Sequence, residues 1–329
     1  MTLTRRPEEG GFSLLIASGI DQHLLAGPAA ETPGGAGTCG RLAPLLEAPA
    51  ILGGQAADVP LAQHGFSALV QARKGDRVRR LLFDTGITPE GCAGNLRRLG
   101  QDPAGIEAIV CSHGHFDHTT GLSGLIGQLG RASLPVLIHP GFWARRRLAI
   151  PGGEPFELPA TSRSALEGAG FEVIEQRQPS FLYDRSVLIT GEVDRVTGFE
   201  KGFPVHQAWR GGSWQPDPLI LDDQALIAHV AGRGLVVLTG CGHAGVINIC
   251  RYAQRLTGVD KLHAVIGGFH LGLAPAEYLQ HSLRELESLS PDVIVPMHCT
   301  GAPFISMLRE RMPGKVVYSN VGSRFTFGA

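Results

Sequence analysis

The chain has 329 residues, and 43% of them are hydrophobic, so it is long enough for one large domain or two with a substantial core. The formal net charge of −1 provides no overall field that would attract nucleic acid or an anionic membrane. No stretch is long and apolar enough to span a membrane, and the six cysteines lack the close-paired spacing of a disulfide framework or a cysteine-only zinc site.

We expect residues 1–55 to form an amino-terminal extension outside the main domain, which would then cover residues 56–329. A basic pair followed by apolar residues 12–20 faintly resembles an export signal, but Glu8, Glu9 and Asp21 interrupt the pattern. We therefore expect a cytoplasmic protein.

The hydrophobic pattern after residue 65 predicts a hairpin and then alternating strands and helices. The expected strands cover residues 66–72, 78–83, 106–111, 135–139, 223–230, 235–238, 263–266 and 293–295. The expected helices are one that ends at residues 95–99 and others at 119–129, 246–256, 276–289 and 304–312. Sheets with helices on their outer faces form an αβ/βα sandwich, so we predict a four-layer α/β fold.

Residues 141–218 interrupt this regular pattern. The stretch is rich in proline and glycine and then contains Trp209 and Trp214. Loops carried on a rigid framework are where substrate contacts concentrate. We predict that these residues form an insert that acts as a wall or lid over the site; an irregular connection with a purely structural role is the alternative.

The segment Cys111-Ser112-His113-Gly114-His115-Phe116-Asp117-His118 places three histidines and a carboxylate within six positions. It directly follows a short, apolar, β-favouring run that predicts a buried strand. Imidazole and carboxylate together suit zinc or a similar divalent transition metal. The segment therefore predicts a metal site at a strand end, and the alternative is a polar turn with incidental histidines.

The His-x-His-x-Asp-His pattern resembles the signature of the metallo-β-lactamase fold superfamily. Three further segments agree with it in order: residues 81–86 as a strand-Asp-Thr-Gly motif, residues 239–245 and residues 293–301. The sequence motifs around His243, Gly267-Gly268 and His298 are similar to those of one branch of this superfamily. That branch contains archaeal dihydropterin-6-yl-methyl-aminobenzene-ribofuranosyl phosphate synthases and bacterial metal-dependent hydrolases. The resemblance covers roughly residues 59–329.

This resemblance implies two metal sites. The first would consist of His113, His115 and His243, and the second of Asp117, His118 and His298. It implies two Zn²⁺ ions, with Mn²⁺ or Fe²⁺ as alternatives. Two catalytic roles follow: Asp117 would also orient the nucleophile, and Asp84 would orient a metal-bound histidine without contacting the metal.

One feature departs from the pattern of many relatives, which have a bridging Asp between the last two histidine motifs. Here Gly267-Gly268-Phe269-His270 occupies that place. His270 is therefore a further catalytic candidate, either as a replacement ligand or as a hydrogen-bond donor to one.

Several other residues have alternative interpretations. We expect Cys111, Cys241 and Cys299 to pack the floor of the site, with thiolate ligation by one of them as the alternative. His64 either lines the site or is a buried structural histidine, and His139 is expected to be a polar strand-end residue. The following histidines are interpreted as ordinary surface or core residues: His23, His206, His229, His263 and His281.

These interpretations predict a dinuclear metal-dependent hydrolase that uses a metal-bound hydroxide on an ester, lactone or phosphoester, including phosphodiesters and phosphotriesters. The alternatives are a synthase or lyase for a phosphorylated pterin-like substrate, and a protein that holds metal or ligand without catalysis. We expect a small-molecule substrate, with neither nucleic acid nor membrane as partner; a homodimer stays open. Arg145-Arg146-Arg147 is explained equally by a solvated helix face and by a substrate-phosphate contact.

Overall fold

The computed structural model describes residues 9–18, 45–129 and 133–328, and its main feature is a sheet of thirteen strands. The sheet consists of two halves that meet at β1 (Glu9–Ser18). One half continues from β1 through β4 (Ser67–Lys74), β5 (Arg77–Phe83), β6 (Ala108–Val110), β7 (Leu134–Ile138) and β10 (Phe171–Glu175). The other contains β15 (Leu226–Val230), β16 (Gly234–Thr239), β17 (Leu262–Gly267) and β18 (Val293–Pro296), while β11 (Ser180–Leu182), β12 (Val187–Ile189) and β19 (Arg324–Phe327) pair beside this path.

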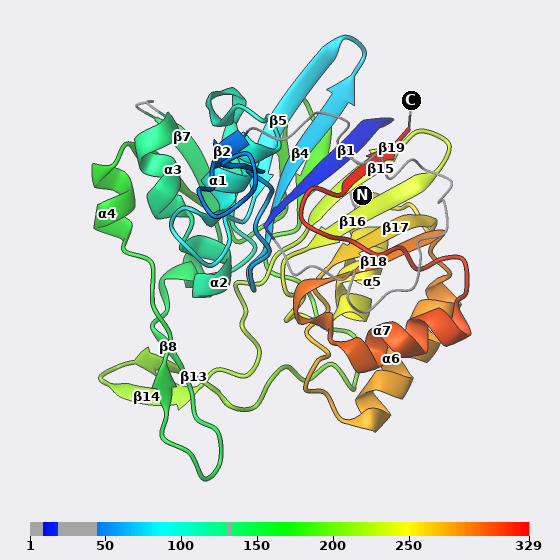
Figure 1. Ribbon diagram of the computed structural model, residues 1–329. Helices are drawn as coiled ribbons and strands as arrows, with labels where there is room; N and C mark the ends of the chain where they lie inside the picture. Colours follow the sequence, from blue (N-terminus) through cyan, green and yellow to red (C-terminus); the bar gives the residue numbers. More distant parts are fainter. Residues whose placement is uncertain (1–8, 19–44, 130–132, 329) are drawn as a thin grey trace.

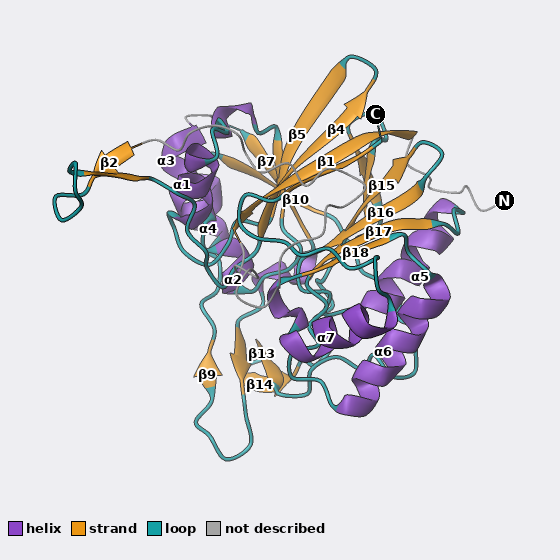
Figure 2. Ribbon diagram, turned by 45° about the vertical axis from the view of Figure 1, so that its right-hand side comes forward, coloured by secondary structure: helices purple, strands orange, loops and turns teal. Residues whose placement is uncertain are grey.

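Helices cover the outer face of each half (Figure 1, Figure 2). The first half carries α1 (Gly91–Arg98), α3 (Leu122–Leu129) and α4 (Arg163–Gly168). The second carries α5 (Val246–Thr257), α6 (Ala276–Leu289) and α7 (Ala302–Arg311). Short elements complete the chain: α2 (Phe116–Thr119) and the 3₁₀ helices η2 (Pro103–Gly105), η3 (Pro140–Trp143) and η4 (His298–Thr300).

Alternation along the strands explains the layers. In β5, Leu81 and Phe83 face a core shared by both halves, whereas Leu82 packs with residues of α1 and α3. In β17, Ile266 faces the shared core and Val265 packs with residues of α5 and α6. Successive strand residues point to opposite faces, so strands that are apolar on both faces bury both. The predicted four-layer αβ/βα sandwich is confirmed.

The amino-terminal residues differ from the prediction of an extension. Glu9–Ser18 forms β1, which pairs antiparallel with β4 and parallel with β15. Phe12, Leu14 and Ile16 alternate into the shared core. The apolar run that resembled an interrupted signal is therefore a central strand, and its partners in β4 lie 49 or more positions away in sequence. Residues 1–8 and 19–44 of the predicted extension lie outside the described residues.

The predicted insert at residues 141–218 is divided between two sheets. Its middle part, α4, β10, β11 and β12, belongs to the large sheet and its helical cover. Its two ends form a separate four-stranded sheet of β8 (Arg146–Leu148), β9 (Phe156–Glu157), β13 (His206–Arg210) and β14 (Ser213–Pro216), which projects from the body of the molecule (Figure 1). A hairpin of β2 (Leu45–Glu47) and β3 (Gln55–Ala57) stands apart from both sheets. In the described ranges, no helix combines the length and the apolar character needed to cross a bilayer.

Candidate metal centre

The predicted ligands follow the carboxyl ends of parallel strands. Strands β5 and β6 pair in parallel, as do β16, β17 and β18. Asp84 follows β5, the histidine-rich segment follows β6, and His243 and His298 follow β16 and β18. Carboxyl ends of parallel strands meet at one edge of a sheet, which is where α/β proteins place their sites. The fold thereby brings together residues that are up to 214 positions apart in the numbering from Asp84 to His298.

Three buried histidines form a first cluster. His113 Nε2 lies 3.0 Å from His115 Nδ1 and 3.2 Å from His243 Nε2. Burial lowers the pKa of all three imidazoles, so each is neutral and offers a lone pair. Three converging imidazole nitrogens are the protein donor set of one class of catalytic zinc site, in which water or substrate is the fourth ligand. These residues therefore fit a divalent metal ion.

A second cluster lies beside the first, with the rings of His113 and His118 at a centroid distance of 4.4 Å. Its members offer four ligand atoms, from Asp117, His118, Cys241 and His298. His118 Nε2 is 3.1 Å from His298 Nε2 and 3.7 Å from an Asp117 carboxylate oxygen, which is 3.3 Å from His298 Nε2. The structure thus brings together all six predicted metal ligands, and Cys241 joins them.

Asp84 connects the two clusters through hydrogen bonds. Its Oδ2 accepts from His118 Nδ1 at 2.7 Å and from Ser112 Oγ at 2.7 Å, while Oδ1 accepts from the Ser112 amide at 2.6 Å. Ser112 Oγ is also 2.9 Å from His113 Nδ1. Gly240 makes this close packing possible, because a Cβ there would lie 2.0 Å from Ser112 Oγ. Asp84 thus contacts the ring of His118 directly and that of His113 through Ser112, and its orienting role stays a prediction.

In the second cluster, interactions between His118 and the carboxylates favour the charged forms of His118 and Asp117. Burial lowers the pKa of His118, but Asp117 and Asp84 raise it more, so that the net value is about 9. Burial raises the pKa of Asp117, and His118 and His298 outweigh this effect and lower it below its usual range. A cation in this cluster therefore competes with a proton for His118.

His270 lies in neither cluster, although it is close to the first. Its ring centroid is 4.2 Å from that of His243. Burial, together with His298, lowers its pKa to about 4, so its imidazole is neutral. The ring of His270 therefore packs against that of a predicted ligand, and both roles considered for it stay predictions.

Two other histidines lie at the site: His206 differs from its sequence interpretation, and His64 takes one of the two positions considered for it. His206, interpreted as ordinary, begins β13 of the small sheet, and its ring centroid is 5.0 Å from His115 and 5.7 Å from His243. It is buried, and its Nδ1 has no hydrogen-bond partner among the described residues. His64 is exposed, with its ring 5.0 Å from that of His298, so it lines the site and is not a buried structural residue. Contacts between distant segments place both rings at the site, and no local sequence pattern indicates that His206 lies there.

The residues Asp222-Asp223-Gln224 hold the ligand loops, and the sequence analysis missed them. Asp222 Oδ2 accepts from the Gly114 amide at 2.8 Å, and Asp223 Oδ2 accepts from the Ala244 amide at 2.9 Å. Gln224 bonds the backbone of Cys111 and Ser112. Two adjacent carboxylates directly before an apolar strand were the available signal. Because these side chains serve the loops, β15 begins at Leu226 and not at residue 223 as predicted.

Arg146 has neither role that was considered for the basic triplet. It is buried on β8 and pairs with Asp217 at 2.9 Å and with Asp222 at 2.5 Å. Because Asp222 also holds the loop at Gly114, this ion pair fastens the small sheet to the first cluster. Buried ion pairs require both partners, since removal of one leaves an uncompensated charge.

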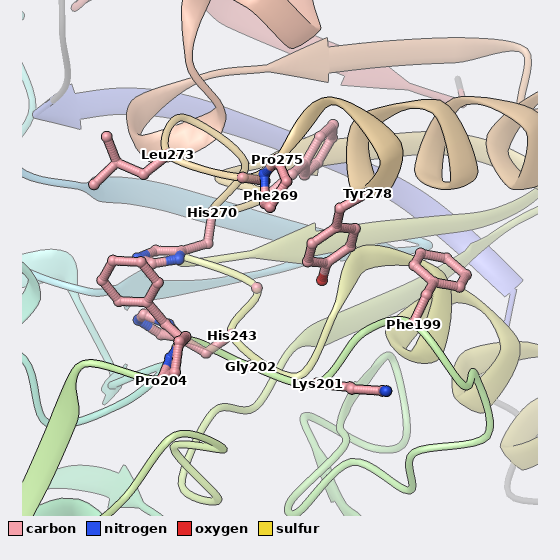
Figure 3. Close-up of a pocket in the computed structure, with 13 residues that line it drawn as sticks. Phe199, Lys201, Gly202, Pro204, His243, Phe269, His270, Leu273, Pro275 and Tyr278 are labelled. Carbon is pink, nitrogen blue, oxygen red and sulfur yellow. The ribbon is translucent and has the colours of Figure 1, made fainter.

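A pocket of about 320 Å³ opens beside the first cluster. Figure 3 shows His243 and His270 at one side of it, and Tyr278, Lys201 and Phe199 at the other. Most of its wall is apolar, and the following side chains contribute: Phe199, Phe203, Pro204, Phe269, Leu273, Pro275 and Tyr278. The volume is in the range of small-molecule sites, which are typically apolar with a few polar groups.

The segment that carries Lys201 into the wall of this pocket is hydrogen-bonded to helix α5 through the neighbouring Glu200. Glu200 accepts from the amides of Ile247 at 2.9 Å and Asn248 at 2.8 Å, in the first turn of the helix. Asn248 Oδ1 in return accepts from the amides of Val196 and Thr197. A carboxylate suits a helix amino terminus, where amide groups lack partners.

Comparisons with known proteins agree with this geometry. The chain is 29% identical over 254 residues to the 7,8-dihydropterin-6-methyl-4-(beta-D-ribofuranosyl)-aminobenzene-5'-phosphate synthase of Methanocaldococcus jannaschii, covering 75% of this chain and 84% of that protein. It is 31% identical over 262 residues to an uncharacterised protein of the same organism, covering 79% of this chain and 92% of that one. A solved structure described as a metal-dependent hydrolase of the beta-lactamase superfamily superimposes with a TM-score of 0.68 at 20% identity, covering 95% of this chain and 98% of that chain. The family model described as the metallo-beta-lactamase superfamily matches residues 64–246, and the chain belongs to this superfamily.

Proposed function

We propose that the protein is a metal-dependent hydrolase for an ester, lactone or phosphoester that carries an apolar group. The observation that carries the proposal is the buried three-histidine cluster beside an apolar pocket. A bound divalent cation, for which Zn²⁺ is our candidate at two per chain, lowers the pKa of a coordinated water and polarises a substrate oxygen. In the overall reaction, water oxygen bonds to the carbonyl carbon or phosphorus, the bond to the leaving oxygen breaks, and a proton passes to that oxygen.

The chain's own groups have distinct tasks in this proposal. One carboxylate oxygen of Asp117 lies near His118 and His298. The Asp117 side chain is 16% exposed, so it can hold the attacking water as well as a metal. His270 and His206 line the approach to the first cluster and can donate hydrogen bonds to a substrate. The aromatic walls exclude water and bind the apolar part of the substrate, while Lys201 offers a positive charge to an anionic substituent.

The test combines metal analysis with turnover of aryl esters, lactones, phosphodiesters and phosphotriesters. We expect turnover of at least one class by the metal-loaded protein, and a loss of at least about 100-fold in kcat for Asp117→Asn with little change in stability, as for other groups that position a reacting atom. Asp184→Asn is the matched control, because Asp184 is exposed and pairs with Arg77 at the start of β5, the end of that strand opposite to Asp84. Metal-loaded protein with no turnover of any class, or full turnover by Asp117→Asn with full metal content, would overturn the proposal.

A synthase or lyase acting on a phosphorylated pterin-like substrate is the second candidate. It is favoured by the pairing of aromatic walls with Lys201 in one pocket, and by the name of the Methanocaldococcus relative. This candidate predicts that a pterin or a ribosyl phosphate binds tightly while simple aryl esters bind poorly, measured by calorimetry. Ordered metal with neither turnover nor binding would instead support a protein that holds metal without catalysis.

A further inference from the structure

We propose that Cys241 is a metal ligand and that Asp117, His118, Cys241 and His298 form a closed four-coordinate site, whereas the three-histidine cluster keeps an open position. This inference rests on the metal occupancy of the proposed function and not on its reaction. It assigns the two sites different tasks.

Four distances in the second cluster come within about 0.2 Å of the spacing in a tetrahedral site. Metal–ligand bonds of about 2.0–2.3 Å place tetrahedral ligand atoms about 3.3–3.8 Å apart. Four of the six edges are 3.1 Å (His118 to His298), 3.2 Å (His118 to Cys241 Sγ), 3.3 Å (His298 to Asp117) and 3.7 Å (His118 to Asp117). All four ligand atoms lie within 4.8 Å of one another. The sulfur therefore occupies a corner of the ligand set and not a place behind it.

The orientation of His118 supports the same assignment. Its Nδ1 is engaged by Asp84 at 2.7 Å, so Nε2 is the nitrogen that faces Cys241 and His298. Both the thiol and the imidazoles are buried, with 3% exposure for Cys241 and 0% for His118. Thiolate, imidazole and carboxylate together are a donor set that suits zinc.

Backbone packing holds the loop that carries Cys241 in place. A Cβ on Gly268 would lie 2.5 Å from the Gly240 carbonyl oxygen and 3.2 Å from Cys241 Cα. The glycines thus let the loop after β17 lie directly against the loop that carries Cys241, and they leave no space for a side chain at position 268.

Cys299 is the competing thiol, and its geometry differs. Its Sγ is 3.3 Å from Cys241 Sγ and 3.5 Å from the Cys241 carbonyl oxygen. It is partly exposed, and it is not one of the four clustered ligand residues. Cys299 therefore packs behind Cys241 as a weak donor to its sulfur, which makes it the matched control for a test of Cys241.

The consequence is an unequal pair of metal sites. Asp117 and a Cys241 thiolate carry two negative charges, which balance a divalent cation, and four ligands leave that cation no free tetrahedral position. Three neutral imidazoles leave the other cation its full charge and one open position. Closed sites are typical of structural metals and open ones of catalytic metals. Polarisation of the substrate oxygen is therefore assigned to the three-histidine site beside the pocket, whereas Asp117, as a ligand of the closed site, can still hold the attacking water.

Cobalt(II) reconstitution of the metal-free full-length protein tests this assignment. A bound thiolate gives cobalt a charge-transfer absorption band in the near ultraviolet, whereas histidine and carboxylate ligands do not. We expect the band in the wild-type protein and in Cys299→Ser, and its absence in Cys241→Ser, which should also bind one of its two cobalt ions at least about 10-fold more weakly. A band that persists in Cys241→Ser, or that disappears only in Cys299→Ser, would overturn the assignment.

X-ray absorption of the zinc-loaded wild-type protein gives a second measurement that does not depend on a variant's folding. We expect one sulfur at about 2.3 Å, averaged over two zinc ions. Two bound ions without sulfur, or failure to bind a second ion, would refute the closed site. Neither readout involves turnover, so a band without hydrolysis refutes only the proposed function, and hydrolysis without a band refutes only the ligand assignment.

Discussion

Replacing Asp84 with asparagine removes one negative charge from beneath both clusters while nearly preserving the shape of the side chain. Asp84 has a left-handed backbone with φ of 58°, which asparagine tolerates better than most residues, so the backbone should not change. The asparagine oxygen can still accept from the Ser112 amide. Its NH₂ group, however, would face His118 Nδ1, which now donates to the carboxylate at 2.7 Å.

Two donors cannot form that hydrogen bond, so His118 is driven toward the tautomer with its proton on Nε2. This is the nitrogen that faces Cys241 and His298, and a protonated nitrogen cannot bind metal. Changes of groups that orient metal ligands typically reduce metal affinity about 10–100-fold. This corresponds to about 1.4–2.8 kcal/mol in binding free energy, because each tenfold change is about 1.4 kcal/mol.

Competition with a chromogenic chelator measures the two affinities separately. We expect Asp84→Asn to weaken the second site by about 10–100-fold, with a smaller loss at the three-histidine site, to which Asp84 connects through Ser112 Oγ and His113. Asp184→Asn is the matched control, because Asp184 also has a left-handed backbone, with φ of 52°, but is exposed. Wild-type affinity at both sites in Asp84→Asn would refute the argument that Asp84 fixes the tautomer of His118.

Three further changes test the surroundings of the site. Arg146→Met should lower the free energy of unfolding, measured in guanidinium, by about 3–5 kcal/mol, because it leaves buried Asp222 without a cation. Exposed Arg145→Met is the control, with an expected loss under about 1 kcal/mol. A loss as small as this in Arg146→Met would contradict the anchoring role. Burial raises the pKa of Glu200 from 4.5 to about 7, so the folded state holds this proton more tightly than the unfolded state does. The wild type should therefore lose up to about 3 kcal/mol of stability relative to Glu200→Gln as the pH rises from about 4.5 to 7. A difference in stability that does not depend on pH would refute the shift. His206→Ala should raise KM for an aryl ester about 5–10-fold at unchanged metal content, because one substrate hydrogen bond is lost; loss of metal would instead make His206 a support for the ligands.

Local sequence determined much of the fold and the chemistry of the site. The mainly apolar runs at residues 66–72 and 81–83 and the apolar run before Cys111 predicted strands that the structure contains, because side chains of a strand buried on both faces must be apolar. The spacing from His113 to His118 kept four ligand residues within one loop and one helical turn, so that local geometry alone holds them near one another. The position of His243 and His298 after strands was equally visible, since parallel strands end at a common edge.

Tertiary structure decided the remaining features. Glu9–Ser18 became a central strand because its partners in β4, β15 and β19 complete the shared core, which no local pattern could reveal. The burial of Arg146, the approach of His206 to the first cluster and the place of Cys241 in the second likewise depend on contacts between distant segments. A side chain's chemical type is carried by the sequence, but the neighbours that set its burial, charge and ligands are determined only when the two halves of the sheet pack together.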